Sequence, residues 1–104
     1  MLLVNTDYNE GKKFEMIGMV RGTMIQSVHI GKDIMNSFKT LVGGELTSYT
    51  EMMNEARAVA TKRMAEDAAA MGADAVVNIR YSSSTIVQGA AEVMAYGTAV
   101  KFVN

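Results

Sequence analysis

The feature that most constrains the fold is residues 48–81, where a long amphipathic helix is followed almost directly by a strand. Ser48 and Glu51 have the spacing of a capping box, in which each side chain binds a free backbone N–H group at a helix start. Gly72 predicts the helix end, because glycine adopts the left-handed conformation without a Cβ clash. Between them, apolar residues recur every three or four positions and predict one buried helix face: Met53, Ala56, Ala60, Met64, Ala68 and Met71.

The segment after Gly72 predicts a strand that packs back on this helix. Residues 75–81 alternate apolar with more polar side chains, as a half-buried strand does. Ala73 and Asp74 leave room for little more than a tight turn before it. On the helix itself, Arg63 and Asp67 have the spacing of an i,i+4 ion pair.

The rest of the chain supplies further strands and a second helix. Strands are expected over residues 2–8, 14–25 and 92–103. A shorter helix is expected over residues 31–42, ended by Gly43 and Gly44. Residues 82–89 are rich in serine, and we expect them to form a polar connection.

The last strand is expected at the centre of the sheet. Residues 92–103 carry apolar side chains on both faces, as a strand that is covered on two sides does. This strand therefore fits between those over 14–25 and 75–81 and runs antiparallel to both. Gly18 and Gly22 indicate a bulge or the close approach of another element. The predicted fold is α/β, of the α+β type, with two layers, a mostly antiparallel sheet, one long helix and one short helix.

Composition limits the classes of function. The 104 residues are expected to form a single domain, residues 1–104. A formal net charge of −1 gives no electrostatic case for nucleic-acid binding. The absence of cysteine excludes disulfides and thiolate metal sites. The start lacks the pattern of a signal peptide, and no stretch is long and apolar enough to span a bilayer. We therefore expect a cytoplasmic protein with no membrane partner.

Several short motifs together resemble one family of small bacterial proteins. They are Gly18-Met19-Val20, Gly43-Gly44-Glu45, Tyr49-Thr50, residues 64–68, residues 72–76 and Tyr96-Gly97-Thr98-Ala99-Val100. In this order and spacing they cover nearly the whole chain and resemble the YbjQ-like family, which is also described as putative heavy-metal-binding. The resemblance implies a compact α/β subunit related to the dodecin-like folds. It also implies assembly into a ring, as a homopentamer.

A metal site is not expected within one chain. Soft divalent metals need thiolate or imidazole ligands at defined spacing, and this chain has no cysteine and one histidine, His29. The ten methionines offer thioethers to Cu(I), but methionine also fills irregular cores. Five of them are expected on buried faces: Met16, Met53, Met64, Met71 and Met94. We therefore expect no metal and no cofactor, with a His29 site built across subunits as the open alternative.

The candidate ligand-binding residues are Gly43, Gly44, Glu45 and Tyr49, where the short helix is expected to end and the long one to begin. Backbone N–H groups at a helix N-terminus can hold an anion, and a glycine pair permits close approach. Alternatively, the glycines cap the short helix and Glu45 stabilises the positive end of the long helix. No Lys or Arg adjoins the glycines, which favours the capping role.

Self-association is the property that the sequence pattern favours most. The strands over 14–25 and 92–103 are apolar on both faces, so the face without helices keeps a larger apolar patch than soluble monomers expose. Closed assembly buries such a patch without open-ended growth. No positioned histidine or paired carboxylates indicate an enzyme. We expect an oligomeric binding or scaffolding module of unknown ligand. The alternative is a metal- or small-ligand-binding protein with a site at subunit interfaces.

Overall fold

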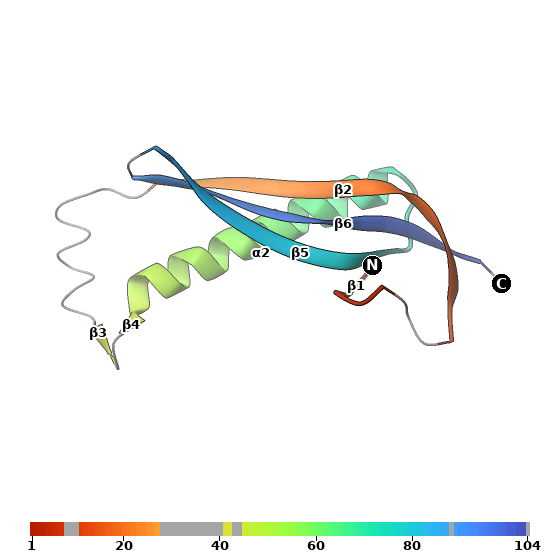
Figure 1. The fold of residues 1–104 in the computed structure, drawn as a ribbon, viewed down its shortest axis with the longest axis horizontal. Coiled ribbons are helices and arrows are strands. Elements are labelled where there is room, and N and C mark those ends of the chain that lie inside the picture. Colours follow the sequence, from red (N-terminus) through yellow and green to blue (C-terminus); the bar gives the residue numbers. More distant parts are fainter. Residues whose placement is uncertain (8–10, 28–40, 43–44, 88, 104) are drawn as a thin grey trace.

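In the described residues, one long helix crosses one face of a four-stranded sheet (Figure 1). The computed structural model describes residues 1–7, 11–27, 41–42, 45–87 and 89–103. The sheet contains β1 (Leu2–Leu3), β2 (Lys13–Ser27), β5 (Ala75–Val87) and β6 (Ala90–Val103). The helix is α2 (Thr47–Ala70), and the two-residue strands β3 (Leu41–Val42) and β4 (Glu45–Leu46) pair with each other just before it. The predicted α+β class is confirmed.

The order of strands in the sheet is β1-β5-β6-β2. β6 pairs antiparallel with both β5 and β2, whereas β1 runs parallel to β5. The prediction that the last strand lies between the other two long strands is therefore confirmed. Residues 31–40 of the predicted short helix lie outside the described residues. For Leu41 and Val42 the helix prediction is wrong, because they form β3 and pair with β4.

β5 and β6 form a longer hairpin than the sequence predicts. β5 continues to Val87, so the connection predicted over residues 82–89 is wrong for most of its length. The serine run pairs with β6, where Ser82 lies opposite Met94. Pairing with a long neighbouring strand satisfies the backbone N–H and C=O groups on one edge of this run, whatever its side chains are.

The buried face of α2 is the predicted stripe of small and flexible residues. The fully buried members are Ala56, Ala60, Met64 and Ala68. They share a core with Val20 of β2 and with Val93 and Ala95 of β6. Met53 is partly buried, but Met71 is 41% exposed because it lies beyond the last helical residue, so the stripe is confirmed except there. No helix in the described part of the chain is long and apolar enough to cross a membrane.

Two glycines of β2 allow α2 to approach the sheet closely. A Cβ atom at Gly22 would collide with the backbone of Ala60 and Met64. At Gly18 the nearest atom to an added Cβ would be the Cε of Met71, at 3.3 Å. The predicted close approach is confirmed at both positions, and a bulge beside Gly18 accompanies it.

The helix ends at the predicted glycine. Gly72 has a φ of 80°, and the Ala73 N–H donates to the Ala68 carbonyl at 3.1 Å, which satisfies a carbonyl of the last turn. The following turn is tied to β6, since the Asp74 carboxylate accepts a hydrogen bond from the Phe102 N–H at 2.8 Å. These contacts set the position of β5 relative to α2.

One predicted contact within the helix is replaced by a contact between helix and sheet. Arg63 Nη1 donates to the Thr23 carbonyl of β2 at 2.6 Å, and no ion pair with Asp67 forms. β2 is an edge strand of the sheet, so its carbonyl is an unused acceptor within reach of the long Arg63 side chain. The ion pair found on α2 joins Lys62 and Glu66 at 3.9 Å, and both side chains are exposed.

Candidate functional site: a pocket on the open face of the sheet

The sheet face turned away from α2, called the open face below, has no helix over it in the described structure (Figure 1). Side chains along β6 alternate between the two faces. Val93, Ala95 and Ala99 belong to the core under α2 and are buried. Met94 and Tyr96 alternate with them and lie on the open face, where Tyr96 is 36% exposed. The central strand therefore contributes apolar side chains to both faces, as predicted.

A β-bulge places two methionines of β2 on the open face. Across β6, Met16 lies opposite Val100, and Met19 lies opposite Thr98. The bulge between Met16 and Gly18 changes the alternation, so Met16 and Met19 share a face although they are three positions apart. Their side chains are 75% and 81% exposed. The prediction that Met16 is buried is wrong, because in the described structure no second layer covers it.

One end of the open face is covered by the N-terminal segment. β1 is shorter than predicted, but the chain continues beside β5, where the Val4 N–H donates to the Val76 carbonyl at 3.0 Å. Val4 packs against a small second cluster, which consists of Ala75, Val77 and Val100 with the partly buried Phe14 and Phe102. Within the described structure, the backbone contacts of this segment with β5 end near Ile79, and Val4 packs only on this end of the open face.

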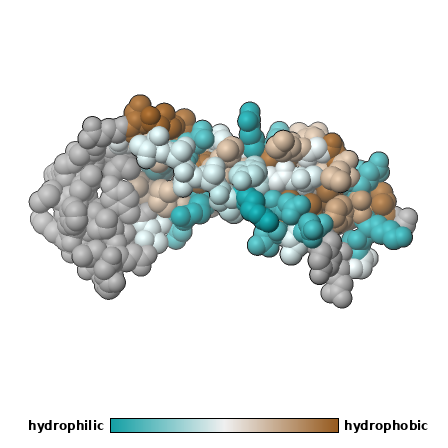
Figure 2. All heavy atoms as spheres, in the orientation of Figure 1, coloured by the Kyte–Doolittle hydropathy of each residue, from teal (hydrophilic) through white to brown (hydrophobic). Residues whose placement is uncertain are grey.

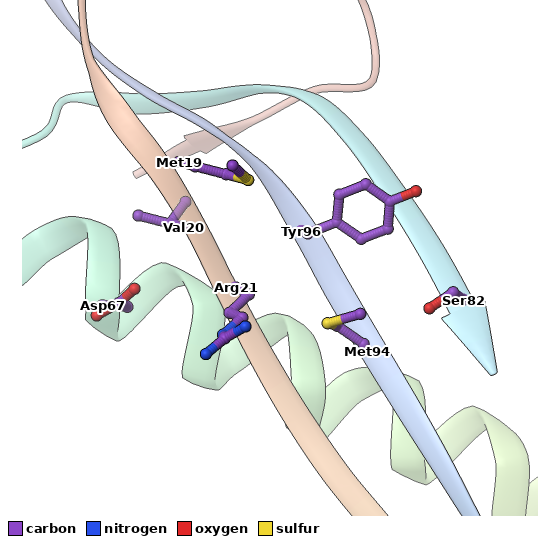
Figure 3. A pocket seen from close by; sticks show the side chains of 7 residues that line it. All are labelled: Met19, Val20, Arg21, Asp67, Ser82, Met94 and Tyr96. Atoms are coloured by element: carbon purple, nitrogen blue, oxygen red, sulfur yellow. The ribbon is translucent and has the colours of Figure 1, made fainter. Parts of the chain in front are cut away.

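In the described structure, a pocket of about 560 Å³ opens on the part of the open face around Tyr96, and its lining also includes Val20, which faces α2, and Asp67 of α2 itself (Figure 3). Its lining residues are Met19, Val20, Arg21, Asp67, Ser82, Met94 and Tyr96. Its apolar lining includes two thioethers, a phenol ring and Val20, and Arg21, Ser82 and Asp67 supply the polar groups. Small-molecule sites in proteins typically measure roughly 300–1,000 Å³ and combine an apolar lining with few polar groups. This pocket can therefore hold a small ligand with an apolar body.

A row of two arginines and one tyrosine crosses the open face at the pocket. Tyr96 of β6 lies opposite Arg21 of β2 on one side and opposite Arg80 of β5 on the other. Arg80 Nη1 donates to the carbonyls of Asn5 and Ile79, both at 2.9 Å. Neither arginine has an ion-pair partner among the described residues. The row therefore carries two positive charges that make no ion pair within the described chain, although Asp67 lines the same pocket as Arg21.

The residues predicted to bind a ligand are described only in part. Gly43 and Gly44 lie outside the described residues. Glu45 belongs to β4, and Tyr49 belongs to the first turn of α2. Their grouping into an anion site stays a prediction, and the pocket on the open face is a separate site that none of these four residues lines.

The residues described here do not assemble a metal site within one chain. They contain no group of three or more His, Cys, Asp or Glu side chains that could hold a metal ion. His29 lies outside the described residues. Among the methionines, Met64 is buried in the core, whereas Met16 and Met19 are exposed on the open face. Exposed thioethers alone are soft ligands, which suit Cu(I) rather than heavy metals in general.

Sequence reasoning does not reveal the pocket, because its lining comes from four separate elements. The available signal is a positive charge at Arg21 and at Arg80, each on a strand that is otherwise mostly apolar or uncharged. Only the register shows that Tyr96 lies between them. Bulges in both strand pairings shift that register, so alternation counted along the sequence does not reproduce it.

The sheet with one helix on one face and a pocket on the other defines a small α+β domain. The chain belongs to the YbjQ family, whose model carries the description "Putative heavy-metal-binding" and matches residues 1–103. The resemblance inferred from the sequence motifs is therefore confirmed.

Relatives support this assignment, and a solved structure shares the fold. The chain is 64% identical to a UPF0145 protein of Alkaliphilus metalliredigens (strain QYMF), over 99% of this chain and 100% of that protein. It is 53% identical to a UPF0145 protein of Methanosarcina acetivorans, over 100% of this chain and 99% of that protein. A crystal structure of a protein of unknown function from Pediococcus pentosaceus, of the DUF74 family, matches with a TM-score of 0.66 at 16% identity and covers 99% of this chain and 98% of that one. At this identity the structural match shows a shared fold.

Proposed function

We propose that the protein is a homo-oligomeric binding module in which a second copy of the chain covers the open face. The observation that carries this proposal is the exposure of large apolar side chains on that face, which are Met16, Met19, Ile25 and Tyr96. Soluble monomers rarely leave a large apolar patch in contact with water. Burial of this patch between copies supplies a hydrophobic driving force for assembly.

The end of the β5–β6 hairpin extends the apolar surface. Ile86 and Val87 lie there and are 49% and 61% exposed. Figure 2 shows strongly hydrophobic residues gathered at this end of the molecule, at the upper left of the view. The exposed apolar side chains thus extend beyond the pocket, as a protein–protein interface requires and a small ligand does not.

Free backbone edges favour a second copy of the chain as the partner. β2 pairs with β6 on one side, and most of its other edge is unpaired in the described structure. The N-terminal segment pairs with β5 as far as Ile79, and no strand among the described residues pairs with the outer edge of residues 80–87. Such edges are templates for another strand. A contact between two different surfaces of identical copies repeats until a ring closes, and the family resemblance implies a ring of five.

The alternative function is a metal- or small-ligand-binding protein with its site at subunit interfaces. The family description favours a metal, but the donor atoms of the described residues do not fit a heavy-metal site within one chain. The pocket favours a small ligand, and its place on the open face would put that ligand between copies. The two functions are compatible if assembly closes the pocket.

The interface is tested by placing charges on the open face. In a double variant, Met16→Lys with Met19→Lys, two exposed side chains gain charges that must lose water when the face is covered, so assembly should weaken. We expect light scattering coupled to size-exclusion chromatography to show a loss of oligomer to smaller species. Both side chains are highly exposed in one chain, so circular dichroism should show that the fold is kept.

A matched control separates the interface from general charge effects. The double variant Ala58→Lys with Ala69→Lys adds the same charge on exposed positions of α2, far from the open face. This control should keep the mass of the unmodified protein. If both double variants keep the oligomer, the open face is not the interface, and the proposed assembly is wrong.

A further inference from the structure

We infer that the pocket on the open face binds a small monoanion with an apolar body, such as an aryl or alkyl carboxylate, and that Arg21 is its counter-ion. This inference rests on the proposed function, which it deepens by naming the chemical class of the ligand. Neither the family description nor the relatives' names assign such a site.

The apolar part of the ligand is defined by the lining. Met19 and Met94 line the pocket with their thioethers, and the Tyr96 ring extends from β6 toward β5 (Figure 3). Thioethers are polarisable and flexible, and they pack well against aromatic rings. A phenol ring on the central strand gives a flat surface for a further ring or an alkyl chain. A pocket of about 560 Å³ has room for such a body but not for a macromolecule.

The charged part of the ligand is defined by the arginine row. Arg21 of β2 lines the pocket. Arg80 of β5 lies on the other side of Tyr96, which belongs to the strand between them, β6. Arg80 is held by neutral carbonyl acceptors, which leave its positive charge in place. The guanidinium group of Arg21 is free of hydrogen bonds and ion pairs within the described structure, so it can bind both oxygens of a carboxylate.

The acidic residues near the pocket limit the charge of the ligand. Asp67 lines the pocket from α2, and Figure 3 shows it across β2 from Tyr96. Glu92 lies on the open face two rows away, opposite Ile25 and Ser84. One carboxylate at the pocket wall repels a second negative charge on the ligand, so a monoanion fits better than a phosphate dianion. Asp67 also provides a test, because removal of its negative charge should strengthen the binding of an anion.

The test compares three probes that share one apolar body and differ in charge. They are phenylbutyrate, phenylbutanol and phenylbutylamine, titrated into the full-length protein by calorimetry at fixed protein concentration. We expect the carboxylate to bind about tenfold more tightly than the alcohol, as a charge-assisted hydrogen bond provides, and the amine to bind more weakly than the alcohol.

Variants assign the preference to the named residues. Arg21→Gln should remove the preference for phenylbutyrate and leave the affinity for phenylbutanol unchanged. Asp67→Asn should tighten phenylbutyrate binding, because a repelling charge is lost. The control Arg57→Gln changes an exposed arginine of α2 that donates to Asn54 Oδ1, and it should keep the preference.

The outcomes separate this inference from the proposed function. Equal affinity for all three probes, or a preference that survives Arg21→Gln, would overturn the ligand class. No binding of any probe at millimolar concentration would overturn the pocket as a site. Light scattering on the same samples reports assembly independently. A monomer with Arg21-dependent binding supports the site and refutes the oligomer. An oligomer that binds none of the probes supports the assembly and refutes the site.

Discussion

At the scale of single residues, Gly22 sets the distance between α2 and the sheet. Alanine there would place a Cβ against the backbone of Ala60 and Met64, which cannot rotate away as a side chain can. We predict that Gly22→Ala lowers the free energy of unfolding by about 3 kcal/mol, the upper part of the usual range for overpacked cores. Urea denaturation followed by circular dichroism measures this change.

Gly18→Ala is the matched comparison for that prediction. Its added Cβ would meet the flexible end of Met71 at 3.3 Å, and this side chain is already 41% exposed. The expected loss is below about 1 kcal/mol, because the neighbour can move aside. If both variants lose the same free energy of unfolding at equal protein concentration, Gly22 does not limit how closely α2 approaches the sheet.

Residue-scale predictions from the sequence succeed where one periodicity holds and fail where it is interrupted. The helix stripe through Ala60 and Met64 follows from spacing alone, because a single helix has one period. Strand alternation predicts that Met16 is buried, but a bulge places it with Met19 on a face that no second layer covers in the described structure. A bulge adds one residue to one strand, and no residue type in this stretch marks which one.

At the scale of elements, the junction between α2 and β5 depends on a left-handed residue. Gly72 has a φ of 80°, where a side chain with a Cβ is strained. Gly72→Ala should therefore lower the free energy of unfolding by about 1–2 kcal/mol. Gly72→Asn should cost less, since asparagine tolerates this conformation better than alanine. Thermal unfolding of the three proteins ranks them, and an alanine variant as stable as the unmodified protein would contradict the argument.

Element boundaries were predictable where a local signal marks them. Gly72 marks the end of α2, and the observed end agrees. The end of β5 has no such marker, because serines 82–84 suit a loop by composition and become strand only through pairing with β6. Arg63 likewise binds a carbonyl of β2 instead of Asp67, and residue spacing along a helix does not predict such a contact.

At the scale of the whole molecule, the central position of β6 was predictable because it is apolar on both faces. The pocket was not, since its residues meet only after β2, β5 and β6 are aligned. The expected helix start makes Glu45 and Tyr49 candidate ligand-binding residues, and this role stays a prediction. Local sequence patterns therefore predict helices and strands. A site built from several strands can be predicted only when the register between those strands is known.

The central claim is that another copy of the chain covers the open face, and the mass of the unmodified protein in solution tests it most directly. Light scattering across a dilution series should give a constant mass that is a whole multiple of 11.3 kDa, with five copies as the multiple implied by the family resemblance. Assembly that buries Met16, Met19 and Tyr96 should also persist when salt is added, because apolar burial is not screened as surface ion pairs are. A folded protein that stays at 11.3 kDa at every concentration would contradict the account.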